Sequence, residues 1–456
     1  MSLSTKPVAV LVAFAVCVSG TAVLATGPAS AQTSSIDSCT VIDQPGYYVL
    51  TEDIDLPNQG HVVGLDERAC IDIRANDVIL DGDGHVVDSG RFTKAVGTGN
   101  SMPVRNVTVT DLEGTDNVVN VRFENVTDGR ITNVTSLDPN SYGEGVQVVQ
   151  SKRVEIRESE LHNTYHAGYA AVRISDTTNA TVSNNTFSAT SLGVEAERLS
   201  DSVVKRNSFD VKQFGSAISV ESGSGNLLAE NVVAGRPNHG ILLNGHENTV
   251  AENTIRRADD TGIDVDGSGH TVSNNDVSRA AEWGALVEGS NHTIVKNEFS
   301  RGGDGSDYGG ALRLAGDDHV VASNDLGGVH GVFVRRATGQ TTIRHNDIDA
   351  TYGVRIANED RCRPRWTRAA FVDVRANNFT VSDGDRQAYA VVNEDEQVVT
   401  ATNNYWGAEN GPSSPAGENV TDPITGTAAD GDGAPVSSGV HFDPWLPQEP
   451  TNGTAG

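Results

Sequence analysis

Apolar and polar residues alternate in short runs along most of the chain, and similar runs return at a regular distance. In "GIDVDGSGHTVSNNDV", residues 262–277, the alternation lasts about four residues at a time before glycine or asparagine interrupts it. Closely related segments precede it, "GILLNGHENTVAENTI", and follow it, "GALVEGSNHTIVKNEF". Alternation of period two predicts β-strands rather than helices. Glycine and asparagine predict the turns between them.

The repeat is 22 residues long over much of the chain and can be aligned on one asparagine. Aliphatic residues stand three positions before it and apolar residues two positions after it. The aligned asparagines are Asn185, Asn207, Asn231, Asn253, Asn275, Asn297, Asn324, Asn346 and Asn377. Such a period predicts a solenoid, whose coils bury their apolar faces only by stacking. We expect an all-β solenoid of roughly 13 coils, with asparagine at a corner in the left-handed conformation and its amides bonded between coils.

Both ends of the chain depart from the repeat. An apolar run follows Lys6, and Ala29 and Ala31 fit a signal-peptidase site. The predicted parts are a signal peptide at 1–31, an N-terminal cap at 32–70, the β-helix at 71–406, a C-terminal cap at 407–446 and a disordered tail at 447–456. After signal removal no apolar run could span a membrane. We therefore expect a monomer that is secreted or held at the cell surface.

The net charge and the cysteines indicate which partners the chain excludes and where a disulfide forms. The formal net charge of −28 argues against nucleic-acid binding, because phosphates require lysine and arginine. A diffuse acidic surface is typical of proteins from high-salt environments. In an oxidising compartment Cys39 and Cys70, which flank the first strands, are expected to form a disulfide. Cys362, within the basic insertion 361–368, is then the remaining thiol of the mature chain.

Several motifs resemble one family. The segments "PGYYVL" and "LDGDGH", the repeated N-x-[FIVL] and the ending "NNYWG…FDPWL" resemble secreted β-helix proteins of the NosD and CASH (carbohydrate-binding and sugar hydrolase) type from archaea and bacteria. The resemblance covers about residues 39–446 and, with the acidic composition, favours a haloarchaeal source. It implies a right-handed parallel β-helix. The functions that it implies are carbohydrate binding, polysaccharide cleavage or epimerisation, and assembly of a copper site.

Charged residues occur at outward positions of the repeat. Asp264 and Asp266 lie on one coil and Glu288 on the next, where like charges raise the pKa of one carboxyl group and can divide acid and base roles. These three are catalytic candidates, with Asp266 and Glu288 as the proton-sharing pair. Ca²⁺ is the one candidate cofactor, and a salt-adapted surface is the alternative interpretation. The expected glycan contacts are Glu197, Glu221, Arg313, Arg335 and Arg355.

Two further groups combine aromatic rings or histidines. Tyr165 and His166, in a stretch between coils, are candidates for proton transfer, and Tyr169 beside them is a candidate sugar contact. His270, His292 and His319 each stand five residues before a repeat asparagine. Stacked histidines can share a metal. Their spacing from the inward valines also fits a structural stack at a corner, which we favour.

The leading hypothesis is a secreted or cell-surface protein that binds carbohydrate without catalysis. The alternatives are a polysaccharide lyase, hydrolase or epimerase, and a NosD-like periplasmic copper-site maturation protein. An enzyme requires a groove in which acidic, histidine or tyrosine and arginine side chains converge. A binding module requires exposed aromatic rings along one flank and no such convergence.

Overall fold

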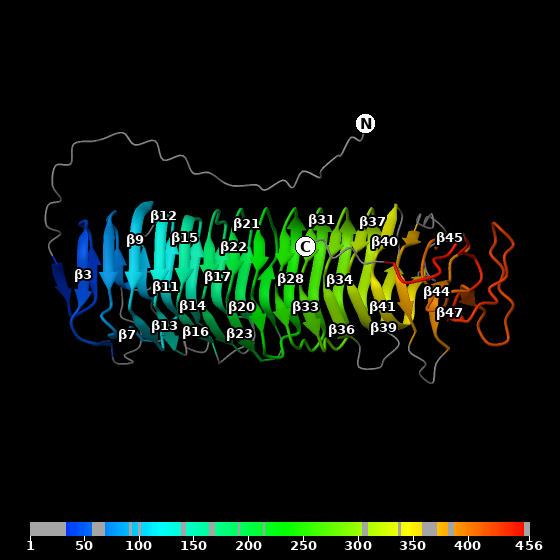
Figure 1. The fold of residues 1–456 in the computed structure, drawn as a ribbon. Coiled ribbons are helices and arrows are strands. Elements are labelled where there is room, and N and C mark those ends of the chain that lie inside the picture. Colours follow the sequence, from blue (N-terminus) through cyan, green and yellow to red (C-terminus); the bar gives the residue numbers. More distant parts are fainter. Residues whose placement is uncertain are drawn as a thin grey trace, which may run out of the picture. The chain divides into compact units, whose positions relative to one another are not determined.

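The computed structural model describes residues 33–56, 69–90, 94–98, 102–137, 143–163, 169–189, 192–212, 215–302, 309–335, 339–357, 372–381 and 387–450. The predicted signal peptide, Tyr165, His166 and Cys362 lie outside these residues. Within them the chain forms a parallel β-solenoid of about 13 coils, as the repeat predicts. Every pairing between named strands is parallel and joins one coil to the next (Figure 1). The described residues contain no helix that could cross a membrane.

The first sheet carries the longest strands of the middle coils. Its strands are β2 (Thr40–Ile42), β5 (Ala69–Ile73), β8 (Lys94–Thr98), β11 (Val119–Glu124), β14 (Glu144–Val149), β17 (Ala170–Ser175), β20 (Leu192–Glu197), β24 (Ser216–Val220), β28 (His239–His246), β31 (Thr261–Ser268), β34 (Trp283–Ser290), β37 (Gly310–Asp317), β39 (Asp325–Arg335), β41 (Asp347–Ala357) and β44 (Tyr389–Asn393).

The second sheet forms another side of each coil. Its strands are β1 (Thr33–Ile36), β3 (Gly46–Leu50), β6 (Val78–Asp81), β9 (Val104–Thr110), β12 (Val126–Thr132), β15 (Lys152–Arg157), β18 (Thr181–Ser183), β22 (Val203–Lys205), β26 (Leu227–Ala229), β29 (Thr249–Ala251), β32 (Thr271–Ser273), β35 (Thr293–Val295), β38 (Val320–Ala322), β40 (Thr341–Arg344), β42 (Val372–Arg375), β45 (Val399–Thr400) and β48 (Val440–His441).

The third sheet closes the coil and joins the first sheet through the long strands β39 and β41. Its other strands are β4 (Ile54–Asp55), β7 (Val86–Asp88), β10 (Glu113–Thr115), β13 (Thr135–Leu137), β16 (Glu160–Asn163), β19 (Thr186–Ala189), β23 (Ser208–Val211), β27 (Val232–Val233), β30 (Thr254–Ile255), β33 (Asp276–Ser278), β36 (Glu298–Gly302) and β43 (Asn378–Thr380). Short strands β21 (Leu199–Ser200) and β25 (Gly223–Ser224) pair with each other, and β25 also pairs with β28 of the first sheet. Strand β46 (Pro412–Ser413) pairs with β47 (Gly433–Pro435) near the C-terminus.

The core runs without interruption through the coils because each coil turns a set of apolar residues inward. Val272 and Ile294, which the repeat places inside, are fully buried and pair in register. At the C-terminal end the indole of Trp406 stacks on Phe379, with 5.2 Å between ring centroids. Trp445 packs against the core there. Large rings thus cover the end of the core.

Buried asparagines bond the coils together along one corner. The side chain of Asn297 accepts hydrogen bonds from both the backbone N–H and the Nδ2 of Asn275, at 3.0 and 2.9 Å. The same pair of bonds links each repeat asparagine to the next, and the series extends one coil beyond the expected one, to Asn404. We call this series the asparagine ladder. It satisfies backbone N–H groups that a corner would otherwise leave without partners.

One expectation about the corner was wrong. The left-handed residue is the one before each ladder asparagine, not the asparagine itself, and its type varies: Arg206, Lys296 and Ala376 have φ values of 55°, 58° and 52°. Each still donates its backbone N–H to a carbonyl of the next coil. The ladder position therefore selects asparagine for its amide, and the neighbouring position tolerates the strain because its hydrogen bond is kept.

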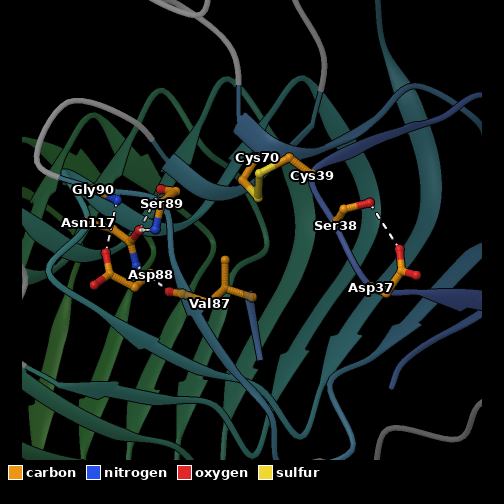
Figure 2. Close-up of a disulfide and its surroundings, with 9 residues drawn as sticks. All are labelled: Asp37, Ser38, Cys39, Cys70, Val87, Asp88, Ser89, Gly90 and Asn117. Atoms are coloured by element: carbon orange, nitrogen blue, oxygen red, sulfur yellow. Dashed lines mark hydrogen bonds between the residues drawn. A yellow bond between two sulfur atoms is a disulfide. The ribbon is translucent and has the colours of Figure 1, made fainter. Parts of the chain in front are cut away.

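The expected disulfide joins Cys39 to Cys70. Figure 2 shows it at the N-terminal coils, near Asn117, whose side chain accepts the backbone N–H of Ser89 at 2.7 Å and donates to the carbonyl of Val87. The bridge ties the segment after β1 to β5, across a sequence separation of 31 residues. Both cysteines lie in the segment 32–70 that the sequence predicts to be the N-terminal cap, so the bridge holds that segment together.

Candidate functional site

The outward side chains of the first sheet stack in columns, with one residue of each column on each coil. Strand pairing places Asp264 beside Leu242 and Leu286, and Asp266 beside Glu288. Strands β28, β31 and β34 carry these residues and lie side by side (Figure 1). The columns that follow the small residue of each coil are therefore those that the sequence predicts.

Asp264 is the most perturbed acid of this face. Its side chain is only 20% exposed, because the leucines of the adjacent coils flank it. His239 lies on the preceding coil, with its Nε2 3.6 Å from Oδ2 of Asp264. The pKa of Asp264 is raised to about 6, mainly by burial; the charge of His239 lowers it, and the nearby acids Glu288 and Asp260 contribute to the increase. Near pH 6 this carboxyl group can both donate and accept a proton.

The pair expected to share a proton lies beside Asp264. Asp266 and Glu288 are in register on adjacent coils, but Asp266 is exposed and the Glu288 side chain is 45% exposed. Arg313, one coil further, places its guanidinium 3.7 Å from Glu288. Acidic, histidine and arginine side chains thus converge here, with Asp264 rather than Asp266 as the sheltered acid.

A second group extends this face toward the C-terminus. Trp283, His330 and Phe333 are buried outside the main core and stack on one another, with centroids 5.4–6.0 Å apart. Tyr352 continues the stack from His330, and Tyr389 continues it from Tyr352, at 5.1 and 6.3 Å. We call these five residues the aromatic strip. The strip packs on the outside of β34, β39, β41 and β44.

Arg355 places a positive charge over two rings of the strip. Its guanidinium carbon lies 5.3 Å from the ring centroid of Phe333 and 5.8 Å from that of Tyr352. Two hydrogen bonds to Glu394, at 3.0 and 3.1 Å, fix the guanidinium plane. The side chain remains 22% exposed. A planar cation held over aromatic rings is suited to recognise carboxylates.

In the N-terminal part of the same face, charged side chains pair with one another. Arg173 forms a salt bridge with Glu195 at 2.8 Å and a closer one with Glu144. Burial raises the pKa of Glu195 while Arg173 opposes the shift. The expected glycan contacts Glu197 and Glu221 are exposed beside this cluster. Because Arg173 already contacts two acids, this region has less capacity for a new anionic partner than the aromatic strip.

Other sequence-predicted residues are less informative. Arg335 lies in register with Ala315 and Ala357, so it belongs to the same face as Glu288. Tyr169 is partly exposed just before β17. Tyr165 and His166, its expected partners in catalysis, lie outside the described residues.

The three aligned histidines form a buried stack at a second corner. The rings of His270, His292 and His319 are nearly parallel, with neighbouring centroids 5.1 Å apart. Nδ1 of His292 accepts the backbone N–H of His270, and its Nε2 bonds the carbonyl of Glu288 at 3.0 Å. The other two rings also use both nitrogens within the protein.

These contacts do not fit a copper site. A histidine binds a metal through a nitrogen lone pair, and here each Nδ1 lone pair accepts a backbone hydrogen. Burial lowers the pKa of all three rings, that of His292 to about 4, so they stay neutral. Among the described residues no group of three or more His, Cys, Asp or Glu could hold a metal ion.

The structure also shows site residues that the sequence argument missed. His239, Trp283, His330, Tyr352 and Tyr389 occupy one column, in register between coils. Each directly precedes the small residue that begins the inward pattern of its coil. The period-two alternation marks as outward only positions after that residue. Aromatic residues recurring before a glycine or alanine were the signal that could have revealed the strip.

Two family models match parts of the chain. Residues 123–311 match the model described as periplasmic copper-binding protein (NosD), and residues 239–405 match the right-handed β-helix region. The search of curated proteins returned no match.

Several solved structures are similar to the chain at low sequence identity. The surface adhesin PfbA of Streptococcus pneumoniae is 14% identical, with 69% of this chain and 88% of that chain covered and a TM-score of 0.38. The DFA-IIIase of Arthrobacter chlorophenolicus A6 without its lid is 14% identical, with 74% and 83% covered and a TM-score of 0.40. The periplasmic alginate epimerase AlgG, as a point mutant, is 11% identical, with 88% and 76% covered and a TM-score of 0.34.

The family matches and the observed coils agree on one architecture. Parallel strands pair coil to coil from β1 to β48, and the right-handed β-helix model matches the coils that carry Asp264 and the aromatic strip. The chain therefore folds as a right-handed parallel β-helix.

Proposed function

We propose that the chain is a secreted glycan-binding protein that holds an acidic polysaccharide along the outer face of the first sheet, from β34 to β44. The observation that carries this proposal is the position of Arg355 over the rings of Phe333 and Tyr352. It combines a fixed cation with aromatic surface at one place.

The geometry of the strip suits a polymer. Neighbouring coils are separated by ~4.8 Å, which is close to the length of one sugar ring. A chain of sugars lying along the stack therefore meets about one coil per residue. Tyr352 and Tyr389 are partly exposed and offer their rings to the apolar faces of sugars. Arg313 and Arg355 offer donors to the carboxylates of uronic acids.

Two matched arginines test this proposal. Arg355→Ala removes the cation from the strip, whereas Arg375→Ala removes an arginine of β42 on the second sheet, which also has an acidic partner, Asp373 at 3.4 Å. We expect binding to polygalacturonate and alginate, measured by affinity electrophoresis, to weaken about tenfold in Arg355→Ala and to stay unchanged in Arg375→Ala. Equal effects of the two variants, or equally tight binding to neutral dextran, would contradict the proposal.

A second candidate function is acid–base catalysis on the bound polymer, as in a lyase, hydrolase or epimerase. Asp264 favours it, because its pKa of about 6 is near that of an efficient proton donor and acceptor at neutral pH. His239 is close enough to stabilise its charged form. Arg313 and Glu288 complete the converging group.

One experiment distinguishes the catalytic function from binding alone. Purified protein is incubated with polygalacturonate and with alginate, and new chain ends or altered sugar composition are measured. If the protein is an enzyme, Asp264→Asn should remove turnover and leave binding within about twofold. If wild-type protein changes neither polymer while binding one of them, the protein is a binding module for these polymers.

A further inference from the structure

The chain contains nine N-x-[ST] motifs, the acceptor sequence for N-linked glycans in secreted proteins. Among the residues that the structure describes, none of their asparagines lies on a strand of the first sheet. Asparagine-rich corners produce such motifs by chance, so accessibility has to distinguish the usable ones. The nine asparagines are Asn106, Asn125, Asn133, Asn179, Asn184, Asn291, Asn378, Asn419 and Asn452.

Three of these asparagines occupy exposed corners that border the second sheet. Asn179 stands two residues before β18 and Asn184 directly after it, whereas Asn291 stands two residues before β35. Their φ values are 55°, 55° and 58°, in the left-handed region. Asparagine adopts this conformation more readily than most residues. All three residues are exposed, so a bulky group attached to their side chains does not have to enter the packed coils.

The side-chain amides of these three asparagines are available for reaction. None of the three forms a hydrogen bond with another described residue, whereas the amides of Asn106 and Asn133 each donate to an aspartate. The backbone N–H of each donates to a carbonyl of the next coil, and a sugar on Nδ2 leaves that bond in place. The motif threonines are also not buried. They are Thr181, Thr186 and Thr293.

Asn378 carries the same motif in a different environment. It lies on β43 in register with Asp347 of the preceding coil, to which its Nδ2 donates a hydrogen bond at 3.0 Å. Its Oδ1 is buried. A sugar on Nδ2 would break that hydrogen bond and crowd packed neighbours. The motif therefore does not make Asn378 an acceptor that the folded coil can accommodate.

We infer that the secreted protein carries N-linked glycans on Asn179, Asn184 and Asn291 and none on Asn378. The reaction joins Nδ2 to the anomeric carbon of an oligosaccharide that a lipid carrier supplies as a phosphate ester. The bond between the anomeric carbon and the phosphate oxygen breaks, the phosphate leaves with the electron pair, and one amide proton passes to a base of the transferase. The glycans are attached beside the second sheet, away from the strands that carry the proposed polysaccharide site, and this inference does not depend on that site.

Two threonines in one outward column of the second sheet provide matched variants. Thr293→Val removes the hydroxyl group that the motif at Asn291 requires. Thr271→Val makes the same change at the residue that pairs in register with Thr293, but residue 269 is glycine, so no motif is present there. Valine is compatible with the column, because Val320 occupies it one coil later.

A third variant adds a site at the same kind of corner. Gly269→Asn completes a motif with His270 and Thr271 that has the same three residue types as the motif at Asn291. Gly269 is left-handed, with a φ value of 68°, and the nearest atom to an added Cβ is Cγ of the flexible Glu247 at 3.4 Å. The new side chain therefore fits without displacing backbone.

The protein and its variants are purified from cultures of the organism that encodes them, and peptides are mapped by mass spectrometry with fragmentation that keeps sugars on asparagine. We expect glycans on Asn179, Asn184 and Asn291 and none on Asn378. Thr293→Val should lose only the glycan on Asn291, Thr271→Val should keep all of them, and Gly269→Asn should gain one. Thermal melting confirms that each variant is folded.

Several outcomes would contradict the inference. It is wrong if any of the three asparagines is unmodified in all molecules, if Asn378 is modified, or if Thr293→Val keeps the glycan on Asn291. A folded Gly269→Asn protein without a new glycan would refute the argument from the exposed left-handed corner. Arg355→Ala should leave the map unchanged, so this result is separate from polysaccharide binding at the first sheet.

Discussion

The asparagine ladder and the outer face of the first sheet are both columns with one residue per coil, yet they differ in what repeats. The ladder keeps asparagine from Asn185 to Asn404, and each member bonds the next in the same way. The outer column that contains Asp264 changes at nearly every coil, from Arg173 through leucine to Arg355. A column that repeats has one structural task on every coil, whereas a column that varies can recognise something outside the protein.

Among the inward-facing residues, Val272 is a position where substitution should lower the stability most. Val272→Asp places a charge without a partner in the core and should lower the free energy of unfolding by more than about 4 kcal/mol. Thr271→Asp, one residue away on the outer surface, should change it by less than about 1 kcal/mol. Urea denaturation followed by circular dichroism measures both. A Val272→Asp protein as stable as wild type would show that the inward register is wrong.

The ladder itself is tested at Asn275. Asn275→Leu leaves the backbone N–H and Nδ2 of Asn253 without their acceptor, so we expect a loss of roughly 3 kcal/mol in the free energy of unfolding. Asn274→Lys is the control, because Lys296 occupies the equivalent left-handed position one coil later. If both substitutions are tolerated equally, the ladder contributes shape but little stability.

The histidine stack should make the stability of the protein depend on pH. Because the pKa of His292 is lowered from 6.5 to about 4 in the folded protein, the unfolded chain binds more protons between these values. Stability is therefore complete above about pH 6.5 and falls as the pH decreases toward 4. His292→Asn, which introduces the residue type that Asn248 already supplies in the same column, should remove roughly 2 kcal/mol of the decrease between pH 7 and about pH 4.5. An unchanged difference between the two pH values would refute this assignment.

On the outer face, the dependence of stability on pH should have the opposite sign. The pKa of Asp264 is raised above 3.8 by folding, so its ionisation opposes folding increasingly as the pH rises from about 4 to 6. Asp264→Asn should therefore stabilise the protein by roughly 1–2 kcal/mol at pH 7.5 and by almost nothing at pH 3.5. Asp266→Asn, on the exposed neighbour, is the control and should have no comparable effect. A larger gain from Asp266→Asn would reverse the roles of the two acids.

Much of the fold follows from local sequence signals. The period of the asparagines predicts the coils, the alternation predicts which residues face inward, and Val272 and Ile294 are buried as expected. The bridge between Cys39 and Cys70 is also present. The site is predicted less completely. The sequence predicts Asp264, Asp266 and Glu288 as candidates and gives the proton-sharing role to Asp266 and Glu288, because spacing alone does not tell how deeply each acid is sheltered.

The missing information concerns neighbours that are distant in sequence. Asp264 is sheltered because Leu242 and Leu286 flank it on adjacent coils, whereas Asp266 lies between Asn244 and Glu288. His239 reaches Asp264 from the preceding coil, and the aromatic strip assembles from four strands. None of these contacts is visible within one repeat.

The sequence by itself determined a stack of parallel coils, its inward residues and its repeating corner, because these depend on a period that every coil restates. Only the tertiary structure decided which outward residues meet and that the residue before each ladder asparagine is the left-handed one. Those outcomes depend on how unlike coils pack against one another. The side chains on neighbouring coils determine how exposed each outward residue is and which charges surround it. A repeat pattern alone does not show which side chains those are.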